Sequence, residues 1–268
     1  MSVNVELPFD LERKIFEISA RESQADACRL VLVARRVNAW IYPILYATVM
    51  LRRRRDALKF LAVVEAKPFL ASRVKTLIIY STVGYWQAGL VLATCTTVDR
   101  LSCWVSDPRL RPSLAPYRVK RLSFMLSGFS YATENISPDF ANPFYNQVTH
   151  LHFTDSWVSW VTWTGFHLLP KITHIAFVYD DTSLADDLRV ANAIRDTLSQ
   201  CSSLTLLVLL HTRRLSMAFA LIVDSRFVSI PFSRHVTRIS GSLVDGTGDL
   251  WMLPDIKMSK KASAFPYA

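Results

Sequence analysis

Six short segments of this 268-residue chain share one pattern, apolar-x-x-apolar-x-apolar, which recurs every 21 to 32 residues. The segments are 74–79, 98–103, 119–124, 148–153, 172–177 and 204–209. Each is short and ends in alternating apolar residues, which predicts a β-strand. Between the last two, Ser183 begins a stretch in which Leu184, Leu188, Ala191 and Leu198 fall at helical spacing. Strands and helices that alternate in one direction predict a parallel sheet, and the repeated period predicts an open arc.

Side-chain alternation divides each strand into two sets. The core set is Leu77/Ile79, Leu101/Cys103, Leu122/Phe124, Leu151/Phe153, Ile175/Phe177 and Leu207/Leu209. The opposite set forms the concave face, and its aromatic, Arg and Met side chains are types that protein interfaces favour. We expect the target-binding residues to be Tyr80, Arg100, Trp104, Arg121, Met125, His150, His152 and His174. Tyr80 and Trp104 are predicted to be exposed side by side and, with Arg121, to anchor a partner.

The period is similar to that of leucine-rich repeats, although somewhat stretched. Cys95 and Cys201 each lie six residues before the leading leucine of their repeat. The predicted fold class is therefore α/β: an N-terminal three-helix unit is followed by a short, irregular leucine-rich-repeat-like solenoid with a curved parallel sheet. We assign residues 1–51 to the helical unit, 52–256 to the arc and 257–268 to a flexible tail. Pro231 predicts that the segment 226–232 is an edge strand, with 248–251 as a closing segment.

Residues 5–51 have the pattern of three short helices. The first begins near Pro8, which suits a helix start, and the second runs from about 25 to 35. The third carries Val37, Trp40 and Ile41, and Pro43 is expected to end it. Three short helices bury little surface by themselves, so this unit should dock on a neighbour or a partner.

The same N-terminal residues resemble an F-box. The resemblance rests on 7–11 (Leu-Pro-Phe-Asp-Leu), on Ile15-Phe16 and on the segment 30–36 followed by Trp40, although Ala34 stands where that family usually has Ser or Cys. Residues 43–51 resemble the segment after the box in many fungal F-box-like proteins. The resemblance implies that the unit binds the adaptor of a ubiquitin ligase through Leu7, Pro8, Leu11, Ile15, Phe16, Val33 and Trp40.

Composition and charge limit the function classes. Only 7 of 268 residues are glycine, under half of the typical ~7%, which disfavours phosphate-binding loops. The net charge is +9, and residues 1–75 carry 14 basic and 8 acidic side chains. Such a basic segment is compatible with nucleic acid, an acidic membrane or an acidic protein. Arg52–Arg55 is the densest charge run, interpreted first as a solvated loop and second as a nucleic-acid or nuclear-import patch.

Three further groups of residues have types that could carry chemistry. His150, His152 and His174 would lie close together in this register and could bind zinc, but an exposed polar face is the favoured interpretation. The acidic pairs 180–181 and 186–187 suit a helix start, and the loop 245–249 suits a turn. The sequence contains no catalytic or nucleotide-binding motif, so we expect no enzyme activity, no metal, no cofactor and no small-molecule substrate.

The four cysteines form no C-x-x-C pair, and neither a signal peptide nor an 18-residue apolar stretch is present. We therefore expect an intracellular protein, cytoplasmic or nuclear, with reduced thiols and no membrane partner. The resemblance implies a substrate-recognition subunit of a cullin-type ubiquitin ligase, whose arc holds a target protein. Two alternatives remain at this point: a repeat scaffold that binds no adaptor, and a basic nucleic-acid-binding protein that uses Arg52–Arg55 with Arg100 and Arg121.

Overall fold

The structure is a computed structural model that describes residues 7–114, 116–125, 138–180, 186–212 and 215–231. Within these ranges the protein is α/β, with one eight-stranded sheet in the order of the sequence. Every strand pairs in parallel with the next, and the sheet is open. The parallel sheet and its register, which the repeat predicted, are therefore confirmed.

The sheet contains the six strands of the repeat, the predicted edge strand and one strand that was not predicted. Its strands are β1 Thr48–Leu51, β2 Thr76–Ile79, β3 Arg100–Cys103, β4 Arg121–Phe124, β5 His150–Phe153, β6 His174–Tyr179, β7 Leu206–His211 and β8 Phe227–Pro231. Strand β8 lies at one edge, where Pro231 predicted it. At the other edge, β1 comes from residues that we assigned to the helical unit. The sheet therefore begins at Thr48 rather than after residue 51, because Val49 and Leu51 continue its core row beside β2.

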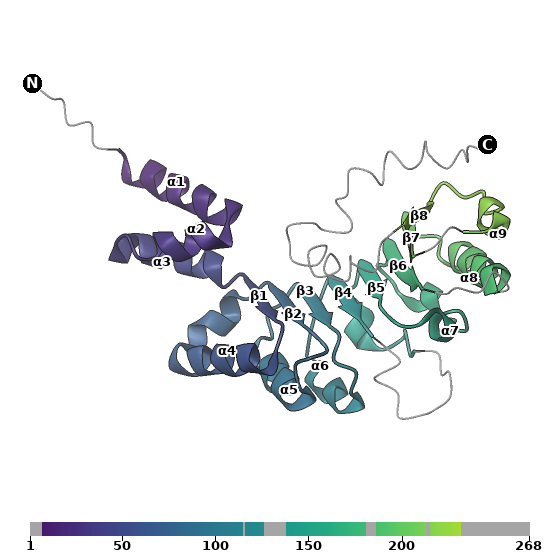
Figure 1. Cartoon of the computed structure of the whole chain (residues 1–268), viewed down its shortest axis with the longest axis horizontal. Coiled ribbons are helices and arrows are strands. Elements are labelled where there is room, and N and C mark those ends of the chain that lie inside the picture. Colours follow the sequence, from purple (N-terminus) through teal and green to yellow (C-terminus); the bar gives the residue numbers. More distant parts are fainter. Residues whose placement is uncertain (1–6, 115, 126–137, 181–185, 213–214, 232–268) are drawn as a thin grey trace, which may run out of the picture.

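The core row of the sheet is continuous. Leu77, Leu101, Leu122, Leu151, Ile175 and Leu207 are aligned from strand to strand, and each is at most 3% exposed. Helices connect the strands and cover this face (Figure 1). They are α4 Arg54–Ala66, η1 Pro68–Arg73, α5 Tyr85–Thr94, η2 Pro108–Leu110, α6 Arg111–Leu114, η4 Pro143–Tyr145, α7 Trp157–Trp160, η5 Phe166–Leu168, α8 Asp187–Gln200 and α9 Met217–Ala220.

Cysteines mark the ends of two of these helices. Cys95 is the C-cap of α5 and Cys201 is the C-cap of α8, and both side chains are buried in the core. Burial raises the pKa of Cys95 to about 12 and that of Cys201 to about 11. Both side chains are therefore protonated thiols at neutral pH, and their role is to fill the space between helix and sheet.

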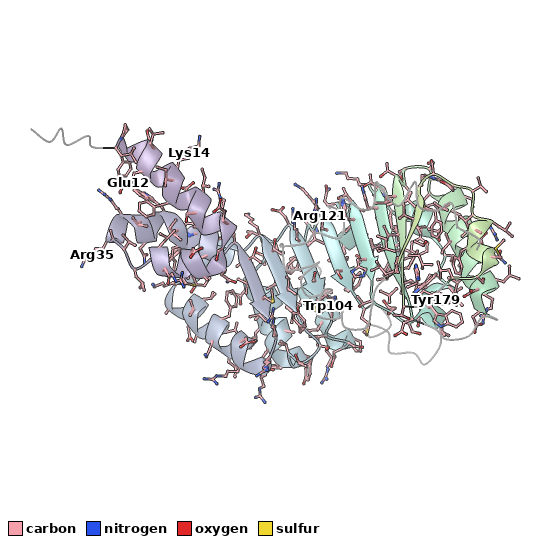
Figure 2. All side chains as sticks on the ribbon, turned by 45° about the horizontal axis from the view of Figure 1, so that its top comes forward. Glu12, Lys14, Arg35, Trp104, Arg121 and Tyr179 are labelled. Atoms are coloured by element: carbon pink, nitrogen blue, oxygen red, sulfur yellow. The ribbon has the colours of Figure 1, made fainter. Side chains whose placement is uncertain are left out.

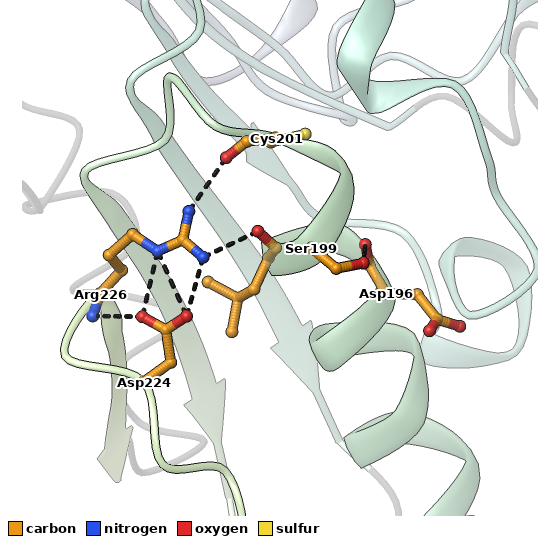
Figure 3. Close-up of polar contacts among 6 residues, drawn as sticks. Asp196, Ser199, Cys201, Asp224 and Arg226 are labelled. Atoms are coloured by element: carbon orange, nitrogen blue, oxygen red, sulfur yellow. Dashed lines mark hydrogen bonds and ion pairs between the residues drawn. The ribbon is translucent and has the colours of Figure 1, made fainter.

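The last repeat is fastened by Arg226 (Figure 3). Its guanidinium donates to the carbonyls of Leu198 and Cys201 at 2.7 and 3.0 Å, and it pairs with Asp224 at 2.8 Å. The final carbonyls of a helix have no partner within the helix, so a cation there satisfies hydrogen bonds and opposes the negative end of the dipole. This contact ties the loop before β8 to the end of α8.

Three helices precede the sheet: α1 Phe9–Glu22, α2 Gln24–Leu30 and α3 Arg35–Leu45. They pack around Ala20, Ala27, Val37 and Ile41, a cluster separate from the sheet core. Helix α2 ends at Leu30, five residues earlier than predicted. Pro43 does not end α3, which continues to Leu45. The missing proline N–H falls in the last turn, so the helix loses only one hydrogen bond near its end.

Candidate interaction surfaces

The sheet face opposite the connecting helices carries the predicted target-binding residues. Arg100 is exposed, and Tyr80, Arg121, Met125, His150 and His174 are half-buried. Arg121 begins β4 whereas Trp104 follows the end of β3, so the two predicted anchors lie toward opposite ends of the strands (Figure 2). From β2 to β5 the face is therefore mostly polar or aromatic, with Ile78 buried among these side chains.

Two of the predicted residues are buried, which corrects the expectation that they present open side chains. Trp104 is 9% exposed and His152 is 6% exposed. Tyr80 does lie beside Trp104, with ring centroids 4.8 Å apart in an edge-to-face arrangement, but the pair is not an exposed one. Ser123 and Ala176 flank His152 in the register. Their small side chains leave room for the rings of Trp104 and His152 to pack close to the sheet.

A hydrogen-bonded chain joins three strands on this face. The Trp104 indole N–H donates to Ser123 Oγ at 3.2 Å, and Ser123 Oγ lies 3.0 Å from His152 Nδ1. A hydroxyl has one donor and two acceptor sites, so Ser123 can accept from Trp104 and hydrogen-bond Nδ1 in either neutral tautomer of His152. Burial lowers the pKa of His152 to about 4, so the ring is neutral at pH 7. These hydrogen bonds fix the side chains at the centre of the sheet face.

The predicted neighbours His150 and His174 are aligned in the register and their rings stack, with centroids 4.1 Å apart. Each Nδ1 lies 2.8 Å from the hydroxyl of the preceding threonine, Thr149 or Thr173. The ring of His152 is engaged by Ser123 instead. Across the part of the chain that the structure describes, no group of three His, Cys, Asp or Glu side chains is placed to hold a metal ion.

Beyond β5 the same face becomes apolar. Ala176, Val208 and Leu210 form a buried cluster that Val178, Leu206 and Ile230 extend. These residues alternate with the core residues of β6, β7 and β8, so they lie on the opposite side of the sheet. We did not predict this apolar half, although the unbroken apolar run from Leu206 to Leu210 was a signal that the strand is buried on both faces.

The outer side of α1 forms a second candidate surface. Leu11, Ile15 and Ile18 are spaced three or four residues apart on α1, Leu7 lies just before the helix begins, and all four are 49 to 56% exposed. We call these four residues the α1 stripe. In contrast, Phe16 faces inward with Trp40, whose ring also contacts Phe9 at 5.0 Å. Five of the predicted adaptor-binding residues, Leu7, Pro8, Leu11, Ile15 and Val33, are thus exposed, whereas Phe16 and Trp40 hold the helices together.

The remaining predicted groups have structural surroundings. Arg54 and Arg55 form the first turn of α4 rather than a loop, because Asp56 accepts the backbone N–H groups of Arg52 and Arg53 and starts the helix. Asp187 begins α8, as predicted for this acidic pair, and accepts from the Tyr179 hydroxyl at 2.6 Å. The predicted features at Ser183, Asp181, 245–249, 248–251 and 257–268 lie outside the described residues.

Comparison of the sequence with models of known families, with curated proteins and with solved structures gave no match. Among the described helices, none has the length and apolar character needed to cross a bilayer.

Proposed function

We propose that this protein is the substrate-recognition subunit of a cullin-type ubiquitin ligase. In this proposal the N-terminal helices bind the ligase adaptor, and the sheet face opposite the connecting helices binds the protein to be modified. The protein places its target and performs no chemistry itself. The observation that carries the proposal is the exposed α1 stripe in a unit whose N-terminal residues resemble an F-box.

The stripe supports a docking role because it adds a second apolar side to a helix that already has one. Phe16 and Ala20 serve the internal cluster, so Leu7, Leu11 and Ile15 contribute nothing to it. Full burial of a Leu or Ile side chain contributes ~1.5–3 kcal/mol, so covering the exposed halves of four such side chains contributes roughly 3–6 kcal/mol. A partner that covers the stripe therefore gains a substantial part of a stable interface.

The target-binding part of the proposal rests on Arg100, Tyr80, Arg121, Met125, His150 and His174, which are exposed or half-buried on one sheet face. Trp104 and His152 take a positioning role, because their hydrogen bonds through Ser123 fix the surface beneath these side chains. Aromatic and Arg side chains held by such a network lose little entropy when a partner binds.

A pull-down with a purified adaptor of a cullin-type ligase tests the proposal. We expect the wild-type chain to retain the adaptor and the double variant Leu11→Ala/Ile15→Ala to bind it at least tenfold more weakly. Leu188→Ala is the matched control, since it removes an equally exposed leucine from α8. If the wild-type chain does not bind the adaptor, the ligase proposal is wrong, and the repeat scaffold and the nucleic-acid-binding protein remain as alternatives.

A further inference from the structure

Helix α5 has an unusual outer surface. None of its ten residues is charged, yet Tyr85, Trp86 and Leu90 are 37, 64 and 43% exposed. Helix α8 lies in the same layer of connecting helices. As is typical of an amphipathic surface helix, its outer side carries charged side chains, among them Arg189 and Arg195. An apolar side that faces solvent on an otherwise amphipathic layer indicates an interaction surface.

The exposed apolar side chains of α5 are continued by those of its neighbour α4. Gly89 faces η2 and α6, because a Cβ at this position would lie 3.5 Å from the Leu110 side chain. Leu90 is 100° further around α5 and therefore lies on the flank toward α4. The corresponding flank of α4, toward α5, carries Leu58, which is 48% exposed. Helical periodicity thus puts the two leucines on the adjoining flanks of α4 and α5, which pack together.

We call this surface the α4–α5 seam and define it by Leu58, Ala62, Trp86, Leu90 and Ala93, all of which are exposed. Trp86 lies at one end of the seam. Ala62 and Ala93 have small side chains, so a partner helix can approach the two helices closely at these positions. The seam is an apolar strip on two packed helices, with the exposed Glu65 beyond Ala62 at the end away from Trp86, and a third helix can pack onto such a strip.

The arginine run lies at the Trp86 end of the seam. The Thr82 hydroxyl, in the loop before α5, donates to the Arg52 carbonyl, so the starts of α4 and α5 are joined. Arg53, Arg54 and Arg55 are exposed, and within the described part of the chain their side chains form no ion pair or hydrogen bond. Positive charge at a helix N-terminus opposes the helix dipole, so these side chains destabilise the start of α4. A charge cluster that costs stability where it lies indicates a binding role.

We propose that the α4–α5 seam binds an acidic amphipathic helix of a partner protein. The helix lays its leucine-type side chains between α4 and α5, and its carboxylates lie beside Arg53, Arg54 and Arg55. A nucleic acid would use the arginines but gain nothing from Leu58 and Leu90. A lipid surface would use Trp86 but gain little from two alanines, whereas small residues favour the close approach of a helix. The surface is separate from the α1 stripe, so it does not depend on adaptor binding.

The probe is a fluorescein-labelled synthetic helix with leucine at every third or fourth position and glutamate elsewhere, and its binding to the full chain is followed by anisotropy. We expect micromolar binding that weakens at least tenfold in Arg54→Glu/Arg55→Glu and at least tenfold in Trp86→Ala. Lys14→Glu/Arg35→Glu changes the net charge equally at a distant exposed site and should bind within twofold of wild type. Leu188→Ala should do the same.

Two further probes separate this partner from the other classes. A peptide with lysine in place of glutamate should not bind, and neither phosphatidylserine vesicles nor duplex DNA should compete with the acidic peptide. The proposal is overturned if the wild-type chain does not bind the acidic peptide, if the arginine variant binds it as well as wild type, or if the vesicles or DNA bind through the arginines and displace it. Circular dichroism melting confirms that each variant is folded, and Arg54→Glu/Arg55→Glu should melt no lower than wild type because it removes charges opposed to the helix dipole.

Discussion

The sheet layer and the three N-terminal helices differ in how much of their apolar surface they bury. In the sheet layer the aligned row from Val49 to Leu207 belongs to one core that continues into the connecting helices. The N-terminal helices enclose only four fully buried residues and leave the α1 stripe outside. A small unit of this kind has little stability of its own. The comparison teaches that the repeat secures the fold, while the helical unit leaves its apolar surface available for docking.

The largest expected effect lies in the shared core. Phe177 is 1% exposed, and its ring lies 4.4 Å from that of Trp160 and 5.5 Å from that of Phe153. We expect Phe177→Ala to lower the free energy of unfolding by about 3–5 kcal/mol, because it removes a ring and leaves a cavity. Urea unfolding followed by tryptophan fluorescence measures this loss. Leu188→Ala should change it by less than about 0.5 kcal/mol, and a loss this small in Phe177→Ala would show that its ring is not packed in the core.

The next effect distinguishes the two regions directly. Ile41 is fully buried in the helical cluster. We expect Ile41→Ala to destabilise that unit by roughly 2–5 kcal/mol, which is enough to open it. Hydrogen exchange should then show lost protection in residues 9–45 and unchanged protection in strands β2 to β7. Equal losses in both regions would mean that they unfold together and that the helical cluster is not a separate unit.

The sheet also carries a pH-dependent contribution to stability from a buried histidine. The folded pKa of His152 is about 4, below its ordinary value of 6.5, so the unfolded chain takes up a proton first as the pH falls. The contribution is complete above pH 6.5, decreases between pH 6.5 and 4 and is lost below that range. It amounts to at most about 3 kcal/mol.

Urea unfolding at pH 7, 5.5 and 4.5 measures this contribution as the difference between wild type and His152→Gln. We expect the stability of the variant to fall less than that of wild type over this range. His167→Gln, at an exposed histidine, should follow wild type. If His152→Gln loses stability in parallel with wild type, the buried imidazole is not the source of the dependence.

The period predicted the direction, register and buried row of the sheet because each of those properties follows from spacing alone. Strand β1 was missed, although Tyr46, Val49 and Leu51 fit the same pattern once the aromatic residue is counted as apolar. The depth of Trp104 and His152 could not be predicted. Alternation assigns a side chain to a face, but how far it is covered depends on the size of its cross-strand neighbours, here Ser123 and Ala176.

The candidate surfaces were predictable to different degrees, because spacing within one element can be derived from the sequence whereas contacts between elements cannot. The exposure of Leu11 and Ile15 followed from a helix too small to bury two apolar sides. The α4–α5 seam did not follow, because Trp86 and Leu90 resemble core residues until the neighbouring helix is placed beside them. Sequence spacing reports which side chains share one element, whereas contacts between elements depend on how the helices pack.

The smallest effect compares two arginines in the sheet layer that share the pattern Asp-x-Arg. Arg226 pairs with Asp224 and also donates to two carbonyls at the end of α8, whereas Arg109 pairs with Asp107 near the solvent. We expect Arg226→Gln to cost about 1–2 kcal/mol, because it leaves the helix carbonyls without a charged donor. Arg109→Gln should cost less, since it removes an exposed ion pair with Asp107 and a contact with the partly exposed ring of Tyr85. Urea unfolding measures both, and the same small change in the two variants would show that the last repeat is held by its apolar contacts rather than by Arg226.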